Sequence, residues 1–343
     1  MSDEDSRPVV YCCTIKQYRE DYLLQNADIK LIVLTIITLN DGSWKVLELE
    51  DKVYASQIKV MFTDLSVLAR YRENLVNLRW AHTAANGVDV FMKALRKDEP
   101  FPNFKLTKTP GALNASQITE YVIGHIIAYE RKLFEAKEAQ DKNKWNRDIY
   151  TNSRYIPSLT IGILGIGQIG QHLAKICKGF GLTVWGLSRR ESSPENRCAY
   201  VDVFRTTERL NDLLENCDYI CNVLPSTPET RDLLSGDVLK ACSCKKSIFI
   251  NVGRGDVIDE QSIVNAIKNG WLSGAVLDVF REEPLPSSSP FWNLPGVIVT
   301  PHVSGWSEAV SYTKKITDFF IDNYQRYTEG LPLKGVLDWS QGY

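Results

Sequence analysis

Residues 160–190 read T-I-G-I-L-G-I-G-Q-I-G-Q-H-L-A-K-I-C-K-G-F-G-L-T-V-W-G-L-S-R-R, and this stretch decides the fold. The apolar run 161–164 predicts a buried strand, residues 168–178 an amphipathic helix, and residues 182–187 a second strand. Between the first strand and the helix stand glycines in the G-x-G-x-x-G pattern of a dinucleotide-binding turn. The stretch therefore predicts a doubly wound α/β domain that binds a dinucleotide.

Each glycine of this pattern has its own role. Gly165 allows the tight turn, Gly167 lets a pyrophosphate approach bare backbone, and Gly170 lets the helix pack closely on the strand. The phosphates would meet free N–H groups at the helix N-terminus, where the helix dipole favours negative charge. A glycine turn without a ligand is the alternative, but the strands and helix around the motif argue against it.

The end of the second predicted strand indicates which dinucleotide is bound. NAD enzymes have an acidic residue there for the ribose 2′-hydroxyl, whereas this chain has Ser188, Arg189 and Arg190. A carboxylate would repel a 2′-phosphate, whereas a hydroxyl and two guanidinium groups would bind it. NADP, as NADPH, is therefore the predicted cofactor, with NAD as the second choice. A solvated pair of surface arginines is the alternative interpretation.

Length and charge limit the kind of protein. The 343 residues suffice for two domains, and the hydrophobic fraction of 44% provides ample material for their cores. A net charge of −2 offers no basic surface for nucleic acid or anionic lipid. The longest apolar run, residues 31–39, is about half of a membrane span, and the start lacks a signal-peptide pattern. We therefore expect no nucleic-acid partner, no membrane and a cytoplasmic location.

The eight cysteines show no C-x-x-C spacing. We predict that they are free thiols in a reducing compartment. Cys242 and Cys244 are the pair that most resembles a metal or redox site, yet no histidine or further cysteine flanks them at ligand spacing. We therefore predict no metal site.

Downstream of the glycine turn, apolar runs alternate with helical segments. Strands are predicted at residues 219–224, 247–252, 274–280 and 297–300. Helices are predicted at residues 207–216, 236–241 and 260–269. This alternation is typical of a parallel sheet with helices on both faces, so these segments extend the doubly wound domain.

Three motifs fall at the ends of predicted strands, where ligands bind in a doubly wound sheet. They are N-V-G-R-G at residues 251–255, D-V-F-R-E-E-P at 278–284 and T-P-H-V-S-G at 300–305. Each motif contains an ionisable side chain, which makes Arg254, Glu283 and His302 candidate active-site residues. Each one taken alone is typical of a surface charge or a turn, but three successive strand ends together favour catalysis.

The N-terminal part is predicted to be a smaller α/β domain. Its short apolar runs lie at residues 9–15, 31–38, 59–62 and 78–81. A long helix at 120–133 should lead into the dinucleotide-binding domain, followed by a charged helix or arm at 135–148. Residues 307–326 have helical periodicity and should return to the first domain.

These features predict a discontinuous chain organisation. Residues 1–122 and 307–343 would form the substrate-binding domain, and residues 123–306 the dinucleotide-binding domain. Ligands often bind where two domains meet, so we expect the active site in the cleft between them.

Further motifs complete the pattern. They are L-R-W-A-H-T-A-A-N-G-V-D at residues 78–89, P-G-A-L-N-A-S-Q-I-T-E-Y at 110–121, L-P-S-T-P-E-T at 224–230 and L-D-V-F-R-E-E-P-L-P at 277–286. With them the chain resembles the D-isomer-specific 2-hydroxyacid dehydrogenases from about Tyr71 onward. The Ser-Arg-Arg sequence at 188–190 and the final V-L-D-W-S-Q-G-Y are most similar to the glyoxylate/hydroxypyruvate reductase branch, which prefers NADPH.

The resemblance implies a Rossmann cofactor domain, a smaller flavodoxin-like substrate domain and a homodimer. It also implies NADPH-dependent reduction of small 2-keto acids, such as glyoxylate or hydroxypyruvate, to D-2-hydroxy acids. One alternative is a reductase of bulkier 2-keto acids, because one sequence does not reveal the pocket volume. Another is a dinucleotide-sensing binding protein similar to the C-terminal-binding-protein corepressors, although the arginine pair argues against it.

The resemblance also implies roles for the three strand-end residues. Reduction of a 2-keto acid needs a cation for the carboxylate, a proton donor for the carbonyl oxygen and a hydride from the nicotinamide. Arg254 would bind the carboxylate and polarise the ketone. His302 would donate the proton, while Glu283 would hold the ring and favour its charged form.

Further contacts are carried over from the same family. Asp278 would face the nicotinamide carboxamide, and Pro225 and Thr230 would line the adenosine side. Other expected cofactor contacts are Gln168, Ile169, Leu224 and Val252. Backbone N–H groups of a loop would complete the carboxylate site, the loop being Ala84, Ala85, Asn86 and Gly87. The family usually has Gly-Ala-Gly at its last three positions, so we expect a tighter or re-aimed loop here. Trp306 is expected to shape the substrate pocket.

Overall fold

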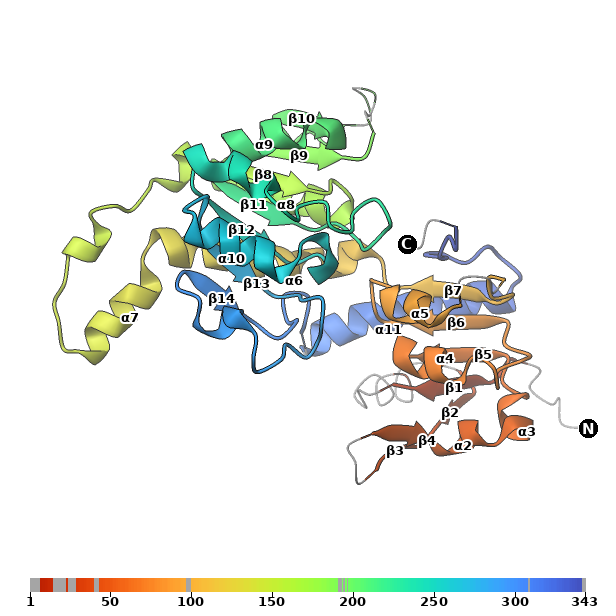
Figure 1. The fold of residues 1–343 in the computed structure, drawn as a ribbon. Helices are drawn as coiled ribbons and strands as arrows, with labels where there is room; N and C mark the ends of the chain where they lie inside the picture. Colours follow the sequence, from red (N-terminus) through yellow and green to blue (C-terminus); the bar gives the residue numbers. More distant parts are fainter. Residues whose placement is uncertain are drawn as a thin grey trace, which may run out of the picture. The chain divides into compact units, whose positions relative to one another are not determined.

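The computed structural model describes residues 7–14, 23, 29–39, 43–96, 100–190, 193, 195, 197–307 and 309–340. The chain divides into two compact units. Residues 1–113 and 307–343 make up the smaller unit, and residues 114–306 the larger one. Each unit is built around its own parallel sheet (Figure 1).

The larger unit contains a seven-stranded parallel sheet with the strand order β10-β9-β8-β11-β12-β13-β14. The strands are β8 (Thr160–Leu164), β9 (Thr183–Ser188), β10 (Val203–Thr206), β11 (Tyr219–Asn222), β12 (Ser247–Asn251), β13 (Leu272–Leu277) and β14 (Val297–Val299). The order runs outward from β8 in both directions, as in dinucleotide-binding domains of the Rossmann type. The predicted doubly wound fold is therefore confirmed.

Helices cover both faces of this sheet. On one face lie α6 (Gly111–Glu130) and α8 (Gln168–Gly179), with Val122 and Leu173 in the core. On the other face lie α9 (Leu210–Asn216), α10 (Glu260–Lys268) and the 3-10 helix η5 (Val238–Cys244). The shorter 3-10 helices are η1 (Asp148–Tyr150), η2 (Ile156–Ser158), η4 (Thr207–Arg209), η6 (Gly255–Val257) and η7 (Pro290–Asn293). Because both faces are buried, the strands are apolar without alternation.

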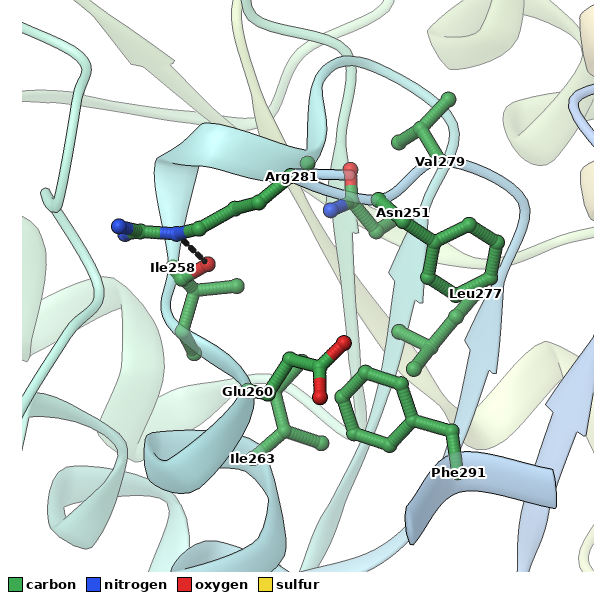
Figure 2. Close-up of a pocket in the computed structure, with 10 residues that line it drawn as sticks. Asn251, Ile258, Glu260, Ile263, Leu277, Val279, Arg281 and Phe291 are labelled. Atoms are coloured by element: carbon green, nitrogen blue, oxygen red, sulfur yellow. Dashed lines mark hydrogen bonds between the residues drawn. The ribbon is translucent and has the colours of Figure 1, made fainter. Parts of the chain in front are cut away.

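The core beside α10 leaves a cavity of about 10 Å³ (Figure 2). Phe291 and Ile263 line it, and the Glu260 carboxylate points toward it. At its rim the Arg281 Nε donates a hydrogen bond of 3.0 Å to the carbonyl oxygen of Ile258. A space of this size holds one water molecule and is too small for an organic acid.

The smaller unit contains a five-stranded parallel sheet with the order β2-β1-β5-β6-β7 and a separate antiparallel pair, β3-β4. The strands are β1 (Val10–Cys13), β2 (Leu31–Val33), β3 (Ile36–Thr38), β4 (Trp44–Val46), β5 (Val60–Thr63), β6 (Trp80–Thr83) and β7 (Lys105–Lys108). Without the inserted pair, the order is that of flavodoxin-like sheets. The predicted flavodoxin-like architecture is therefore confirmed.

Helices also cover both faces of the smaller sheet. The helix α11 (Val310–Thr328) packs on one face, where the Phe320 ring stacks on Phe62 at 4.9 Å and on Trp80 at 5.4 Å between ring centroids. The short helices pack on the opposite face of this sheet. They are α2 (Leu47–Glu50), α3 (Lys52–Ala55), α4 (Leu65–Tyr71) and α5 (Asp89–Ala94). Leu337, near the C-terminus, is buried in the same core. Its N–H donates a hydrogen bond of 2.8 Å to the Leu106 carbonyl.

The structure differs from the sequence-based elements mainly at sheet edges. The strands β4, β7 and β10 were not predicted, because they are short and carry polar residues, as in K-L-T-K of β7. The predicted run 31–38 divides into β2 and β3, which belong to different sheets. The helix α6 begins earlier than predicted, at Gly111 directly after Pro110, where proline favours a helix start.

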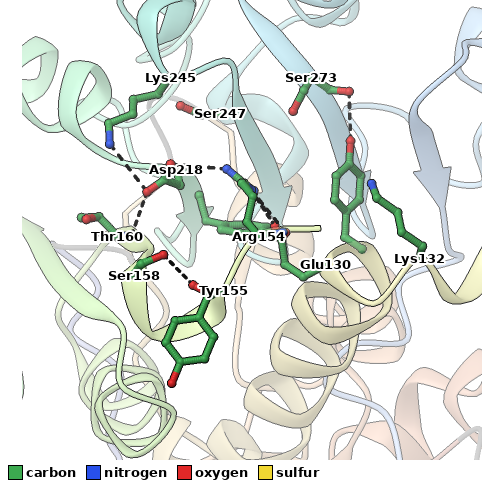
Figure 3. Close-up of polar contacts among 12 residues, drawn as sticks. Glu130, Lys132, Arg154, Tyr155, Ser158, Thr160, Asp218, Lys245, Ser247 and Ser273 are labelled. Carbon is green, nitrogen blue, oxygen red and sulfur yellow. Dashed lines mark hydrogen bonds and ion pairs between the residues drawn. The ribbon is translucent and has the colours of Figure 1, made fainter. Parts of the chain in front are cut away.

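A buried ionic network closes the edge of the larger sheet where its strands begin (Figure 3). Glu130 is only 2% exposed and accepts hydrogen bonds from the Arg154 Nε at 3.1 Å and the Tyr219 hydroxyl at 2.5 Å. The Arg154 Nη1 also reaches the Asp218 Oδ1 at 3.3 Å, and the Asp218 Oδ2 accepts from the Thr160 N–H at 2.9 Å. The network therefore joins the end of α6 to the starts of β8 and β11.

The charge state of Glu130 depends on these partners. Burial by itself would raise the pKa of the Glu130 carboxyl, but the hydrogen bonds from Arg154 and Tyr219 outweigh it and hold the pKa below its usual value. A carboxylate with a lowered pKa stabilises the folded state above its unfolded pKa, and this contribution disappears as the pH falls through the folded pKa.

We expect Glu130→Gln to lower the free energy of unfolding at neutral pH by about 1–3 kcal/mol, because Arg154 and Tyr219 lose a charged acceptor. Urea unfolding followed by circular dichroism measures this change. The matched control is Glu73→Gln on an exposed ion pair with Arg96, where less than about 0.5 kcal/mol is expected. A loss in Glu130→Gln that persists unchanged at acidic pH would contradict the network's role.

Candidate functional site

The glycine turn lies between β8 and α8. Gly165 has a φ of +105°, which favours glycine, and a Cβ on Gly170 would lie 2.0 Å from the Gly165 carbonyl oxygen. At Gly167, apart from the glycine itself and its two chain neighbours, no atom of the described residues lies within 4 Å of the place of a Cβ. In the described part of the chain, no side chain caps the first turn of α8. Bare backbone and uncapped N–H groups together form a cradle that fits a pyrophosphate.

The other predicted cofactor positions cluster around this turn. Gln168 and Ile169 begin α8, and the Leu224 side chain lies 3.2 Å from the place of a Cβ on Gly165. The Thr230 hydroxyl donates to the Pro225 carbonyl at 2.7 Å and thereby closes the loop after β11. Val252, directly after β12, is buried. The structure therefore brings these residues to one edge of the sheet.

The sequence Ser188-Arg189-Arg190 ends β9. The Ser188 hydroxyl donates a hydrogen bond of 2.8 Å to the Arg190 carbonyl, so the serine shapes the turn that carries both arginines. All three residues line a cavity of about 550 Å³ at the ends of β9 and β10. This cavity is large enough for part of a nucleotide.

Arg254 lies in the loop after β12, which two buried asparagines hold. The Asn251 Nδ2 donates to the Arg254 carbonyl at 3.1 Å, and the Asn222 Nδ2 donates to the Asn251 Oδ1 at 2.9 Å. Asn222 was not among the predicted site residues. An amide at the end of an otherwise apolar strand is the signal that could have identified it, because buried polar side chains need hydrogen-bond partners.

His302 and Glu283 form a direct pair. The His302 Nδ1 lies 2.7 Å from the Glu283 Oε2, while the Glu283 Oε1 accepts from the Phe280 N–H at 2.9 Å. The hydrogen bond that His302 donates to the Glu283 carboxylate raises the pKa of His302, whereas burial and the nearby positive charge of Arg254 lower it. Burial opposes ionisation of Glu283, but the bonds from His302 and Phe280 hold its pKa below the usual value. Arg254 thus lies close enough to influence both groups.

Asp278 holds the turn that contains His302. His302 has a φ of +56°, a left-handed conformation that is costly for a residue other than glycine. The fully buried Asp278 carboxylate accepts from the N–H groups of Val303 and Ser304, both at 2.8 Å. Its backbone carbonyl accepts from the His302 N–H at 2.9 Å. These bonds stabilise the unusual backbone; the predicted contact with a nicotinamide carboxamide stays a prediction.

A hydroxyl chain continues from Asp278 to α6. The Thr300 hydroxyl donates to the Asp278 Oδ1 at 2.5 Å, and the Tyr121 hydroxyl lies 2.7 Å from the same Thr300 oxygen. Because the single hydroxyl proton of Thr300 is used in the bond to Asp278, the Tyr121 hydroxyl is the donor in its bond to Thr300. Burial raises the pKa of Tyr121 to about 12, which keeps this donor protonated. Tyr121 and Thr300 were not assigned from the sequence.

The predicted carboxylate loop belongs to the smaller unit, directly after β6. The Ala85 N–H donates to the Thr83 hydroxyl at 3.3 Å, so this group already has a partner within the loop. The Lys108 Nζ donates to the Asn86 carbonyl at 3.1 Å and adds a cation that the sequence did not indicate. Trp306 belongs to the larger unit and is half-exposed. The binding roles of the loop and of Trp306 stay predictions.

Apolar helices and clusters of possible metal ligands are relevant to other kinds of site. Of the helices in the described ranges, none has the length and apolar character needed to cross a membrane. Within the same ranges, no group of three or more His, Cys, Asp or Glu side chains could hold a metal ion. All eight cysteines are free thiols, including Cys242 and Cys244.

Comparison with known proteins gives the same family from sequence and structure. Residues 123–304 match the model of the NAD binding domain of D-isomer specific 2-hydroxyacid dehydrogenase. The chain is 35% identical to glyoxylate/hydroxypyruvate reductase B of Serratia proteamaculans over 242 residues, covering 68% of this chain and 70% of that protein. It is 32% identical to glyoxylate/hydroxypyruvate reductase A of Photorhabdus laumondii over 228 residues, covering 66% and 69%.

Solved structures extend this similarity to both units. A D-isomer specific 2-hydroxyacid dehydrogenase family protein from Aeromonas salmonicida superposes with a TM-score of 0.78 at 29% identity, covering 97% of this chain and 99% of that one. A probable 2-hydroxyacid dehydrogenase from Rhizobium etli superposes with a TM-score of 0.76 at 25% identity, covering 98% and 99%. The latter was solved in complex with NADP, HEPES and L(+)-tartaric acid.

We expect the pKa of His302, followed by its imidazole NMR resonances, to lie above the ordinary value of about 6.5. Glu283→Gln should lower it, because a neutral amide stabilises the imidazolium less than a carboxylate does. His172, which lies 2.9 Å from the Thr119 hydroxyl, serves as the internal reference. A His302 titration curve that is identical in parent and variant would show that Glu283 does not control its charge.

Proposed function

Because this chain belongs to the D-isomer-specific 2-hydroxyacid dehydrogenase family, we propose that it reduces small 2-keto acids of the glyoxylate and hydroxypyruvate type to D-2-hydroxy acids with NADPH. The observation that carries this proposal is the His302–Glu283 pair with Arg254 near it, at the C-terminal edge of a doubly wound sheet. Keto-acid reduction needs a proton donor, a carboxylate that keeps this donor protonated, and a fixed cation.

The residues around the glycine turn fit the cofactor. Bound NADPH would supply the hydride. The turn from Gly165 to Gly170 and the first N–H groups of α8 would hold its pyrophosphate. Arg189 and Arg190 would bind the 2′-phosphate, which supports NADPH over NADH. The NADP complex of the Rhizobium etli relative agrees with this preference.

The side chains then divide the chemistry. Arg254 would hold the substrate carboxylate and polarise the ketone with its planar guanidinium group. The imidazolium of His302, with Nδ1 bound to Glu283, would donate the proton on Nε2 to the carbonyl oxygen as the alkoxide forms. Asp278 would keep the His302 turn in place. Since the protonated ring is the active form, the reduction rate should fall as the pH rises through the pKa of His302.

The proposal also specifies that the substrate is small. The two bacterial reductases named above support glyoxylate and hydroxypyruvate as substrates, and both are small 2-keto acids. A reductase of bulkier keto acids would use the same three groups for the reaction. Turnover with substrates of different size separates the two.

We expect NADPH oxidation, followed at its nicotinamide absorbance, with glyoxylate and hydroxypyruvate, and a lower kcat/KM with a branched or aromatic 2-keto acid. NADH should be the poorer hydride donor.

Arg254→Lys keeps the positive charge but loses the bidentate contact with the substrate carboxylate, so the kcat/KM of this variant should fall by about tenfold to a hundredfold.

A higher kcat/KM with the branched or aromatic acids would show that the substrates are bulkier 2-keto acids, with the type of reaction unchanged. Binding of NADPH without oxidation by any keto acid would overturn the reductase proposal and favour a dinucleotide-sensing role. Normal kinetics of Arg254→Lys would show that another group binds the carboxylate.

We also propose that the protein is a homodimer whose interface includes residues 131–158. This segment extends away from the larger sheet as an arm, and its helix α7 (Leu133–Asp141) has no buried residue in the described structure (Figure 1). Apolar side chains are nevertheless exposed on the arm, with Trp145 94% and Phe134 50% exposed. Exposed aromatic residues on a projecting segment are typical of an interface.

Sedimentation velocity should give twice the monomer mass of 38.9 kDa at micromolar concentration. Replacing Phe134 and Trp145 by Lys should shift the protein to monomer, because two charges would be buried at the interface. Val76→Lys, at an exposed position of the smaller unit, is the matched control and should leave the mass unchanged. A monomeric parent protein would overturn this proposal without affecting the reductase activity assay.

A further inference from the structure

The cavity at the ends of β9 and β10 contains more positive charge than the sequence motif indicated. Among the residues that the structure describes, five of the nine that line this cavity are arginines and one, Glu208, is acidic. Arg189 and Arg190 come from the end of β9, whereas Arg205 and Arg209 come from β10 and the 3-10 helix η4 that follows it. Its volume of about 550 Å³ exceeds the need of a single phosphate group.

The two strand ends meet at this cavity because β9 and β10 are paired in parallel. Ser188 is the register partner of Thr206, so the last residues of both strands lie side by side. Whatever follows Thr206 must therefore share the cavity edge with the residues that follow Ser188. This arrangement places guanidinium groups from two chain segments around one space.

Arg205 is held in place by three contacts. Its Nε donates to the Asp212 carboxylate, its Nη1 donates to the Phe204 carbonyl at 2.8 Å, and its guanidinium carbon lies 4.8 Å from the Trp185 ring centroid. Its side chain is 24% exposed. A cation fixed by this many contacts positions its neighbours and keeps its charge at the cavity wall.

Arg209 shares the same carboxylate but is more open. Its Nη2 donates to the Asp212 Oδ2 at 2.9 Å, and its side chain is 63% exposed. A guanidinium group has five N–H donors, so this contact leaves others for a ligand. The hydrogen bond from Arg205 lowers the pKa of Asp212, which keeps the shared anchor charged.

The charge balance identifies the chemical class of the ligand. A phosphate monoester carries a charge of about −1.5 to −2 near neutral pH and offers three acceptor oxygens. Such a dianion is suited to several guanidinium groups, whereas one carboxylate would leave much of their charge uncompensated. A ribose with a phosphate monoester also uses more of the volume than inorganic phosphate does.

We propose that Arg209 is a further specificity-determining residue, which contacts the ribose 2′-phosphate of the dinucleotide together with Arg189 and Arg190, and that Arg205 positions it through Asp212. This inference rests on the proposed use of NADPH. The usual sequence signal for the 2′-phosphate lies only at the end of the second strand. In this chain the third strand and its following turn contribute as well.

Isothermal titration of the full-length protein tests the pocket without turnover. The probes are 2′,5′-ADP, 3′,5′-ADP and 5′-AMP, which differ in the presence and position of the ribose phosphate. The parent should bind 2′,5′-ADP at least about tenfold more tightly than the other two. Arg209→Ala should weaken 2′,5′-ADP by about tenfold and change 5′-AMP by less than about twofold.

Two further variants make the result specific. Arg205→Ala should weaken 2′,5′-ADP as well, because Arg209 loses its fixed neighbour, while unchanged unfolding curves show that the protein remains folded. Arg79→Ala removes an exposed arginine from the smaller unit and should change nothing. Parent-like affinity of Arg209→Ala for 2′,5′-ADP would overturn the role of Arg209.

The outcomes separate this inference from the reductase proposal. Equal or tighter binding of 3′,5′-ADP would overturn the assignment to a 2′-phosphate, even in an active reductase. The expected binding pattern without keto-acid reduction would support the pocket and overturn the proposed function. Loss of 2′,5′-ADP binding in Arg209→Ala together with a fall in kcat/KM for NADPH, but not for NADH, would support both.

Discussion

Parallel pairing of the strands is the constraint on which the rest of the structure depends. In a parallel sheet every strand ends at the same edge, so residues far apart in the chain reach one place. The glycine turn after β8, the arginines after β9, the Arg254 loop after β12 and the His302 turn after β14 all lie at this edge. The chemistry of the larger unit follows from this geometry.

Buried polar side chains convert these strand ends into fixed geometry. Asn251 and Asn222 hold the Arg254 loop, and Asp278 holds the His302 turn against its unfavourable φ. Each acceptor or donor is buried and satisfied, so moving a loop would leave a polar group without a partner, at a cost of about 1–3 kcal/mol. The positions of the candidate catalytic groups are thus stabilised by residues that need not touch a substrate.

The opposite edge of the same sheet has a different character. There the Glu130–Arg154–Tyr219 network and Asp218 link α6 to the strand starts and anchor the arm of residues 131–158 at its return. Charged groups at this edge join α6 to the sheet, whereas at the other edge Asp278 holds the His302 turn and Arg205 and Arg209 line one cavity. The ionisable residues of the two edges therefore have different surroundings.

The sequence by itself determined the fold class of both units, the glycine turn and the order of the strand-end motifs, because apolar runs and glycines report local burial and local backbone conformation. It also indicated Arg254, Glu283 and His302 through the resemblance to a known family. The sequence did not predict the edge strands β4, β7 and β10, since short polar strands show little hydrophobic periodicity. Only the tertiary structure decided that Asp278 holds the His302 turn, that Asn222 supports Arg254, and that Arg205 and Arg209 join the arginine pair. The reason is that strand neighbours and hydrogen-bond partners are chosen by the register of the sheet, which no local pattern in the chain encodes.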